Sequence, residues 1–203
     1  MPSSRIKAST VKMAKQFAAH VQAKRRRAAF HEASHIEVTK AVAPEATIYA
    51  SVNDYGSGDA TTLFPPGTTR QNKLLVAVAG FLGEAKGHSE KTLSDDRIHA
   101  RVMAADIDRR LRAGEDKFQV DVLMTDGETE MSTTNNRDFA FLLEDLQSKK
   151  HNFRAFFGLD SWANEIQDAI LDCIARLNTE AVWGAVGDTA NHILEHGWYS
   201  TEE

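Results

Sequence analysis

The residues with the clearest chemical potential form the segment His31-Glu32-Ala33-Ser34-His35. If this segment is helical, its two histidines lie on one face, one turn apart, so both imidazoles can reach the same metal ion. Zinc lowers the pKa of a water molecule towards neutrality, and a neighbouring glutamate can accept the proton as the water attacks a peptide carbonyl. The pattern therefore predicts a zinc endopeptidase in which His31 and His35 bind Zn²⁺ and Glu32 is the general base.

A second segment, His192-Ile193-Leu194-Glu195-His196, reads as the inverted pattern H-x-x-E-H. It stands directly before Gly197, where we expect a helix to end. Inverted-motif enzymes need a further acidic ligand downstream, and only Glu202 and Glu203 follow. We therefore expect residues 192–196 to be the polar part of a C-terminal helix.

A catalytic zinc ion normally has three protein ligands, so one ligand is missing from the first motif. The metzincin class is excluded because positions 38 and 41, which need glycine and histidine, are Val38 and Ala41. The third ligand must come from elsewhere in the chain. Glu84 and Asp96, each on or at the start of a later predicted helix, are the leading candidates.

Helical periodicity indicates which elements position these residues. Small and apolar residues recur at helical spacing between Val11 and Val21 and predict a helix over 9–25, followed by a second helix over 26–43 that ends before Pro44. The apolar segment 70–87 predicts a helix near the core, in which Gly80 permits close packing. Further helices are expected from 94–96 to 112 and over 137–149, 160–177 and 178–196.

Strand signals are confined to short stretches. Thr47–Val52 and Ala60–Phe64 flank a Gly-rich turn and predict a β-hairpin beside the helices, and Phe118–Leu123 resembles another strand. The expected fold class is therefore a mainly α, multi-helix metallopeptidase domain with a small β-hairpin or sheet beside the motif helix. An extended substrate could add as a strand to an edge of the hairpin around Thr47–Val52.

The composition is that of a folded globular protein, with 203 residues, 42% of them hydrophobic and 26% charged. No apolar stretch approaches the roughly 20 residues that cross a bilayer, so no membrane span is expected. The single cysteine, Cys173, cannot form an intramolecular disulfide, which favours the reducing cytoplasm. We expect one domain over 26–203, preceded by a basic helical arm over 1–25.

The net charge of −5 conceals an uneven distribution, because residues 1–30 contain basic residues and no acidic ones. The run Lys24-Arg25-Arg26-Arg27 could contact nucleic acid or an anionic surface. Runs of this length are more often the solvated face of a helix. Nucleic-acid binding through residues 5–27 is therefore an alternative function rather than the expected one.

Three motifs together resemble the peptidase domain of the FtsH family of ATP-dependent metalloproteases. Ala29–His35 is similar to that family's A-(aromatic)-H-E-A-G-H, Ala79–Glu84 to its A-G-R-A-A-E, and Ser94-Asp95-Asp96 with Ala100 and Ala104 to its S/N-D-x-x-x-A-x-x-x-A. The resemblance covers residues 26–112 and 160–203, including a closing helix at Ala190–Glu195. It implies that Asp96 is the third zinc ligand and that Glu84 orients a ligand histidine. Asp96 also suits a helix N-terminus, where the helix dipole favours a carboxylate.

The chain also departs from that family. Ser34 and Phe81 replace a glycine and an arginine, residues 113–157 have no counterpart, and no G-x-x-x-x-G-K-[ST] segment is present to bind ATP. The expected enzyme therefore cleaves peptides or unfolded proteins without ATP, either alone or after delivery by a separate partner or ATPase, and its oligomeric state is open. The main alternative is a catalytically inactive, peptidase-like interaction protein.

Overall fold

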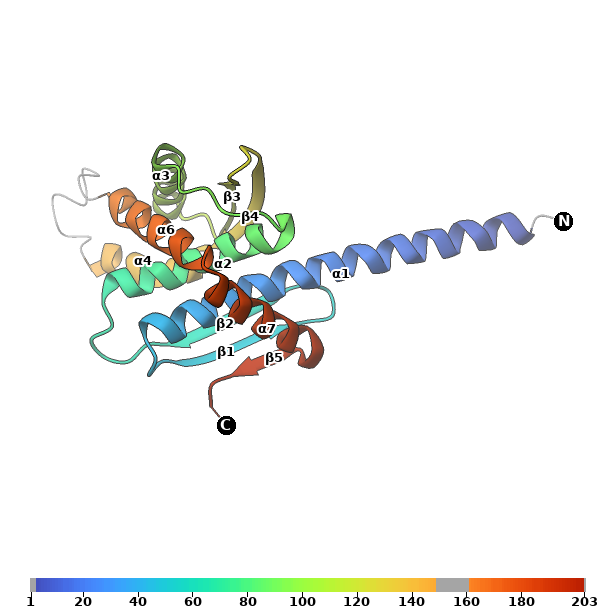
Figure 1. Cartoon of the computed structure of the whole chain (residues 1–203), viewed down its shortest axis with the longest axis horizontal. Helices are drawn as coiled ribbons and strands as arrows, with labels where there is room; N and C mark the ends of the chain where they lie inside the picture. The colour runs from blue at the N-terminus through green and yellow to red at the C-terminus, as the bar shows by residue number, and fades with distance from the viewer. Residues whose placement is uncertain (1–2, 149–160, 203) are drawn as a thin grey trace.

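The computed structural model describes residues 3–148 and 161–202, which form a mainly helical fold with two small antiparallel sheets (Figure 1). The expected mainly α fold with a small β-hairpin or sheet is confirmed. The helices are α1 (Ser3–Val42), α2 (Arg70–Ser89), α3 (Arg97–Ala113), the 3-10 turn η1 (Asn136–Phe139), α4 (Ala140–Ser148), α6 (Ala163–Leu177) and α7 (Glu180–His196). The strands are β1 (Thr47–Val52), β2 (Gly58–Leu63), β3 (Lys117–Leu123), β4 (Thr129–Asn135) and β5 (Trp198–Ser200).

Helix α1 is continuous, so the expected division into separate helices over 9–25 and 26–43 is wrong. The segment contains neither glycine nor proline, and its Lys24–Arg27 run consists of good helix formers. The C-terminal part of α1 packs against α2 and α7, whereas its N-terminal part extends beyond the rest of the chain (Figure 1). The predicted arm over 1–25 is therefore the N-terminal end of the same helix that carries the His31–His35 motif. Residues 1 and 2 of the arm lie outside the described part.

Helix α2 lies at the centre of the core. Every residue from Leu74 to Gly87 is buried, and the helix packs against α1, α6 and β4. A helix that is covered all round can be apolar all round, which explains its sequence. Gly80, Gly83 and Gly87 face α1, where an added Cβ would collide with α1 side chains. The glycines therefore let the two helices approach closely, as expected for Gly80.

We expect Gly83→Ala to lower the free energy of unfolding by about 1–3 kcal/mol, the usual cost of overpacking a core. Its Cβ would lie 1.7 Å from Oγ and 2.4 Å from Cβ of Ser34, and Ser34 Oγ already donates to Phe30 O at 2.8 Å. Gly184→Ala is the matched control, because an added Cβ on α7 has nothing within 4 Å. The control should gain up to about 1 kcal/mol from helix propensity. Urea unfolding of both variants measures these free energies, and an equal change in the two variants would contradict the prediction.

The predicted hairpin is present, with β1 and β2 paired antiparallel from Thr47↔Leu63 to Val52↔Gly58. The sheet has the order β2-β1-β5, so β1 has a partner on both sides. Of the two hairpin edges at which a substrate strand could add, the one at Thr47–Val52 itself is therefore occupied. Within the described residues, β2 pairs only with β1, so its outer edge is the unpaired edge of the hairpin.

The segment after α3 forms a second hairpin, β3–β4. The strand expected at Phe118–Leu123 is confirmed as β3, and β4 is an addition. The expected helices also occur: α3, η1 with α4, α6, and α7, which ends at Gly197 with φ 80°. Residues 149–157 of the segment without a family counterpart lie outside the described part. No helix in the described ranges has both the length and the apolarity of a membrane span.

Candidate metal centre and cleft

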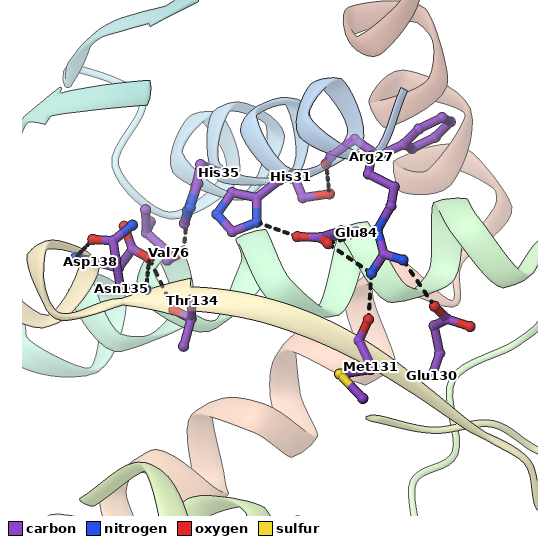
Figure 2. Close-up of polar contacts among 12 residues, drawn as sticks. Arg27, His31, His35, Val76, Glu84, Glu130, Met131, Thr134, Asn135 and Asp138 are labelled. Atoms are coloured by element: carbon purple, nitrogen blue, oxygen red, sulfur yellow. Dashed lines mark hydrogen bonds and ion pairs between the residues drawn. The ribbon is translucent and has the colours of Figure 1, made fainter. Parts of the chain in front are cut away.

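His31 and His35 lie one turn apart on α1, and each ring is held through Nδ1 (Figure 2). Nδ1 of His35 donates to the carbonyl of Val76 at 2.7 Å, and Nδ1 of His31 lies 3.1 Å from Oε2 of Glu84. Such bonds fix the orientation of a ligand histidine and leave Nε2 for a metal. An added Cβ at Gly80 would meet both Nε2 atoms, at 2.3 Å and 2.5 Å. The two nitrogens therefore converge beside a glycine.

The acidic group that joins the histidines is Asp138 of η1. Potential ligand atoms of His31, His35 and Asp138 all lie within 4.8 Å of one another, and among the described residues this is the only group of three or more such side chains. Oδ2 of Asp138 accepts from Thr134 Oγ1 at 3.0 Å and from the amide of Asn135 at 3.3 Å. This capping box at the start of η1 holds the carboxylate in place (Figure 2).

Asp96, the ligand implied by the family resemblance, is not in this group. It is the N-cap of α3, and its Oδ1 accepts from the amide of His99 at 2.7 Å. Helix α3 packs mainly against α6 and β3, away from the histidine pair. The start of a helix was correctly indicated by the sequence, but the structure brings Asp138 rather than Asp96 to the histidines. Asp138 comes from the segment that has no family counterpart, so no motif pointed to it.

Glu84 lies on α2 where the sequence suggested, against His31, and a further residue holds it. Arg27 Nε donates to Glu84 Oε1 at 2.9 Å, Arg27 also pairs with Glu130 at 3.3 Å, and it donates to the carbonyl of Met131. Burial raises the pKa of Glu84, but the hydrogen bond with His31 and the charge of Arg27 outweigh it and lower the pKa. Glu84 therefore stays ionised beside His31. Arg27, which the sequence showed only as part of a basic run, ties α1 to β4 at this point (Figure 2).

Glu32 is buried beside the first residue of β2. An added Cβ at Gly58 would lie 2.3 Å from Glu32 Oε1, so the open strand approaches this carboxylate closely. Burial raises the pKa of Glu32 to about 7, against the opposing charge of His31. A carboxyl group with a pKa near neutrality is suited to accept and return a proton at physiological pH.

The two histidines differ in their electrostatic surroundings. Burial disfavours the charged ring of His31, but its hydrogen bond to Glu84 prevails and raises the pKa of His31 to about 9. Burial lowers the pKa of His35 to about 4. A metal ion that binds near pH 7 must therefore displace a proton from His31, whereas His35 is already neutral. Two imidazole nitrogens and one carboxylate oxygen are a donor set that zinc accepts in catalytic sites.

The inverted motif does not form a comparable site. His192 and His196 are exposed on α7, with ring centroids 4.4 Å apart, and His196 Nε2 lies 3.8 Å from a carboxylate oxygen of the exposed Glu195. Glu202, the described downstream acid, contacts Tyr49 on β1. The described residues of this motif are therefore not brought together with a third acidic ligand.

A cleft runs past Glu32 in two directions. The α1–β4 limb, about 690 Å³, is bounded by α1, the turn before β2, and strands β3 and β4. The β2–α4 limb, about 450 Å³, is bounded by β2, α2, η1 and α4. His31, Glu32, Gly58 and Asn135 line both limbs, so the candidate metal centre lies where they meet. A through-going cleft of this kind can hold an extended chain on both sides of the histidines.

No protein-family model and no curated protein matches the chain.

Proposed function

We propose that the chain is a zinc-dependent endopeptidase of the FtsH type. The observation that carries the proposal is the convergence of the free Nε2 atoms of His31 and His35 with the carboxylate of Asp138, beside the buried Glu32. His31, His35 and Asp138 would hold Zn²⁺. When bound, zinc supplies Lewis-acid chemistry, because it lowers the pKa of water and polarises a peptide carbonyl.

The protein's own side chains would move the proton. Glu32 accepts a proton from the attacking water and then gives it to the leaving amine. Burial, which raises the pKa of Glu32 to about 7 in the metal-free protein, favours uptake of the proton by the carboxylate. Glu84 and Arg27 would keep the ring of His31 in one orientation and one tautomer.

The substrate would bind as an extended strand on the open edge of β2, rather than on β1. Residues from Gly58 to Thr62 line the β2–α4 limb next to Glu32. Main-chain hydrogen bonds to a strand edge recognise a peptide without regard to its sequence, which suits unfolded or flexible protein substrates. Activity in a reducing compartment such as the cytoplasm remains part of this proposal, supported by the single, buried Cys173.

Metal analysis of Asp138→Asn and Asp96→Asn tests the proposed ligand set. The wild type should bind one zinc ion per chain, and Asp138→Asn should weaken the affinity by more than the roughly 10–100-fold that loss of a supporting residue causes. Asp96→Asn should bind zinc normally, because asparagine also caps helices well and α3 is preserved. Zinc titration against a chelating dye measures both. If Asp96→Asn weakens zinc binding more than Asp138→Asn does, the ligand assignment is wrong. If neither the wild type nor any variant binds zinc, the proposed function is wrong.

An inactive interaction protein remains the second candidate, favoured by one observation. Met13 and Phe17 lie one turn apart on the exposed part of α1 and are 67% and 66% exposed. Contiguous exposed apolar residues often mark a surface that meets another protein. Such a surface is also compatible with a partner that delivers substrates, so cleavage measurements, not binding alone, separate the two candidates.

Nucleic-acid binding through the basic run gains no support from the contacts of its arginines. Arg25 donates to a backbone carbonyl of α7, Arg26 pairs with Glu90 at 2.8 Å, and Arg27 pairs with Glu84. Their charges are used within the protein. We therefore retain the peptidase as the proposed function.

A further inference from the structure

Basic side chains gather in the α1–β4 limb of the cleft, outside the candidate metal centre. This limb is lined by Lys24, Arg27, His20, His88 and Lys117, which come from α1, α2 and β3. Its acidic lining consists of the site's own Glu32 and Glu84. Beyond the reaction centre, the wall of this limb is therefore basic.

Only some of these cations are available to a bound peptide. Arg27 is paired with Glu84 and Glu130, and His88 Nε2 lies 3.5 Å from Glu130. Within the part of the chain that the structure describes, Lys24 and Lys117 have no ion-pair partner, and both are exposed. They come from α1 and from the start of β3. A peptide that leaves the metal centre along this limb would pass two uncompensated ammonium groups.

The opposite limb has a different chemistry. Phe64, Val76 and Phe141 line the β2–α4 limb, and Lys73 lies over both phenyl rings, with its Nζ 5.7 Å and 5.9 Å from their centroids. Its other cation, Arg137, lies 4.0 Å from Asp59. Three carboxylates, those of Asp59, Asp138 and Glu144, also line this limb, so its two cations are offset, and the rest of its surface offers aromatic and aliphatic area.

We propose that the enzyme selects peptides with acidic side chains on one side of the scissile bond, the side held in the α1–β4 limb, with Lys24 and Lys117 as the residues that determine this preference. The inference rests on the proposed peptidase function. Opposite charges steer and hold a substrate most effectively where they have no partner in the free protein. In the β2–α4 limb the lining carboxylates offset the charges of Lys73 and Arg137, so this limb would instead favour apolar side chains on the other side of the bond.

The test uses the full-length, zinc-loaded protein and a peptide mixture in which acidic, basic and apolar residues occur equally at each position. Mass spectrometry of the products gives the residues on each side of the cleaved bond. We expect Asp and Glu to be enriched on one side only, by about 2- to 25-fold over Lys and Arg, since each exposed charge pair contributes a factor of about 1.4 to 5. The enrichment should decline in 1 M salt.

Charge reversal supplies the matched comparison. The double variant Lys24→Glu/Lys117→Glu should lose or invert the acidic preference while it still cleaves uncharged peptides. Lys12→Glu/Lys15→Glu makes the same charge change on the exposed arm, outside both limbs, and should keep the preference. If acidic residues are equally frequent on both sides of the cleaved bond, or if both double variants change the acidic preference equally, the proposed charge selection is wrong. The proposed peptidase function would be unaffected by either result. If no peptide is cleaved, the peptidase proposal fails, and fluorescence anisotropy with an acidic and a basic peptide still decides whether Lys24 and Lys117 select charge.

Discussion

Replacing Glu32 with glutamine is expected to abolish peptide hydrolysis while zinc remains bound. Glutamine has nearly the same size and fills the same buried position beside Gly58, but it cannot accept a proton. Loss of a general base costs roughly 10²–10⁴-fold in rate. The zinc content should stay at that of the wild type, because the proposed ligands are His31, His35 and Asp138.

The measurement is kcat/KM on a quenched fluorescent peptide, together with metal analysis of the same sample. Glu37→Gln provides the matched control on the same helix, because Glu37 contacts Lys40 and Thr189 and lines neither limb of the cleft. It should retain wild-type activity. If Glu32→Gln cleaves within about twofold of the wild type, Glu32 is not the base. If it also loses zinc, Glu32 holds the metal, and the assigned roles must change.

Gly80→Ala should eliminate zinc binding without unfolding the protein. The new Cβ would collide with Nε2 of His31 and of His35, the atoms proposed to hold the metal. Both rings are tied through Nδ1, to Glu84 and to Val76, so neither can move away and keep its orientation. We expect the dissociation constant for zinc to rise at least about 100-fold, beyond the usual effect of a supporting residue.

The zinc-free protein should still fold, because the colliding atoms belong to two side chains rather than to the backbone and alanine improves helix propensity. Displacing the two tied rings should lower its free energy of unfolding by about 1–3 kcal/mol, the usual cost of overpacking a core. Zinc titration and urea unfolding of the same variant separate the two effects. Gly83→Ala provides the contrast, since it should affect stability more than metal affinity. Normal zinc binding by Gly80→Ala would show that the two Nε2 atoms do not share a metal.

Elements with strong periodicity were predictable from the sequence, and elements without it were not. The buried run of α2 and the β-branched strand at Thr47–Val52 each carry their own signal. Strand β4 does not, because it buries Ser132 and Thr134 where a strand pattern would call for apolar residues. The separation of α1 into two helices was wrong because the apolar periodicity changes near residue 25 without a glycine or proline to break the helix.

The site was half predictable. His31, Glu32 and His35 are close in sequence, so local helix geometry alone places them together. The third group depends on how β3, β4 and η1 fold back against α1, and nothing in the sequence distinguishes Asp138 from the other acidic residues. Asp96 followed a real local signal, but that signal describes the start of α3. Glu84 was predicted near the site because the segment Ala79–Glu84 resembles an FtsH-family motif, and in the structure its helix packs against α1.

The unbroken course of α1 has a mechanical consequence for the site. At about 1.5 Å per residue, the part of this helix from Ser3 to His31 is about 40 Å long, and it contains no glycine or proline that could act as a hinge. The exposed tip and the two histidines therefore move as parts of one rod. A tilt of the helix by a few degrees where it joins the rest of the fold would displace its N-terminal tip by several ångström. A partner that binds the tip would therefore also set the direction in which the cleft faces.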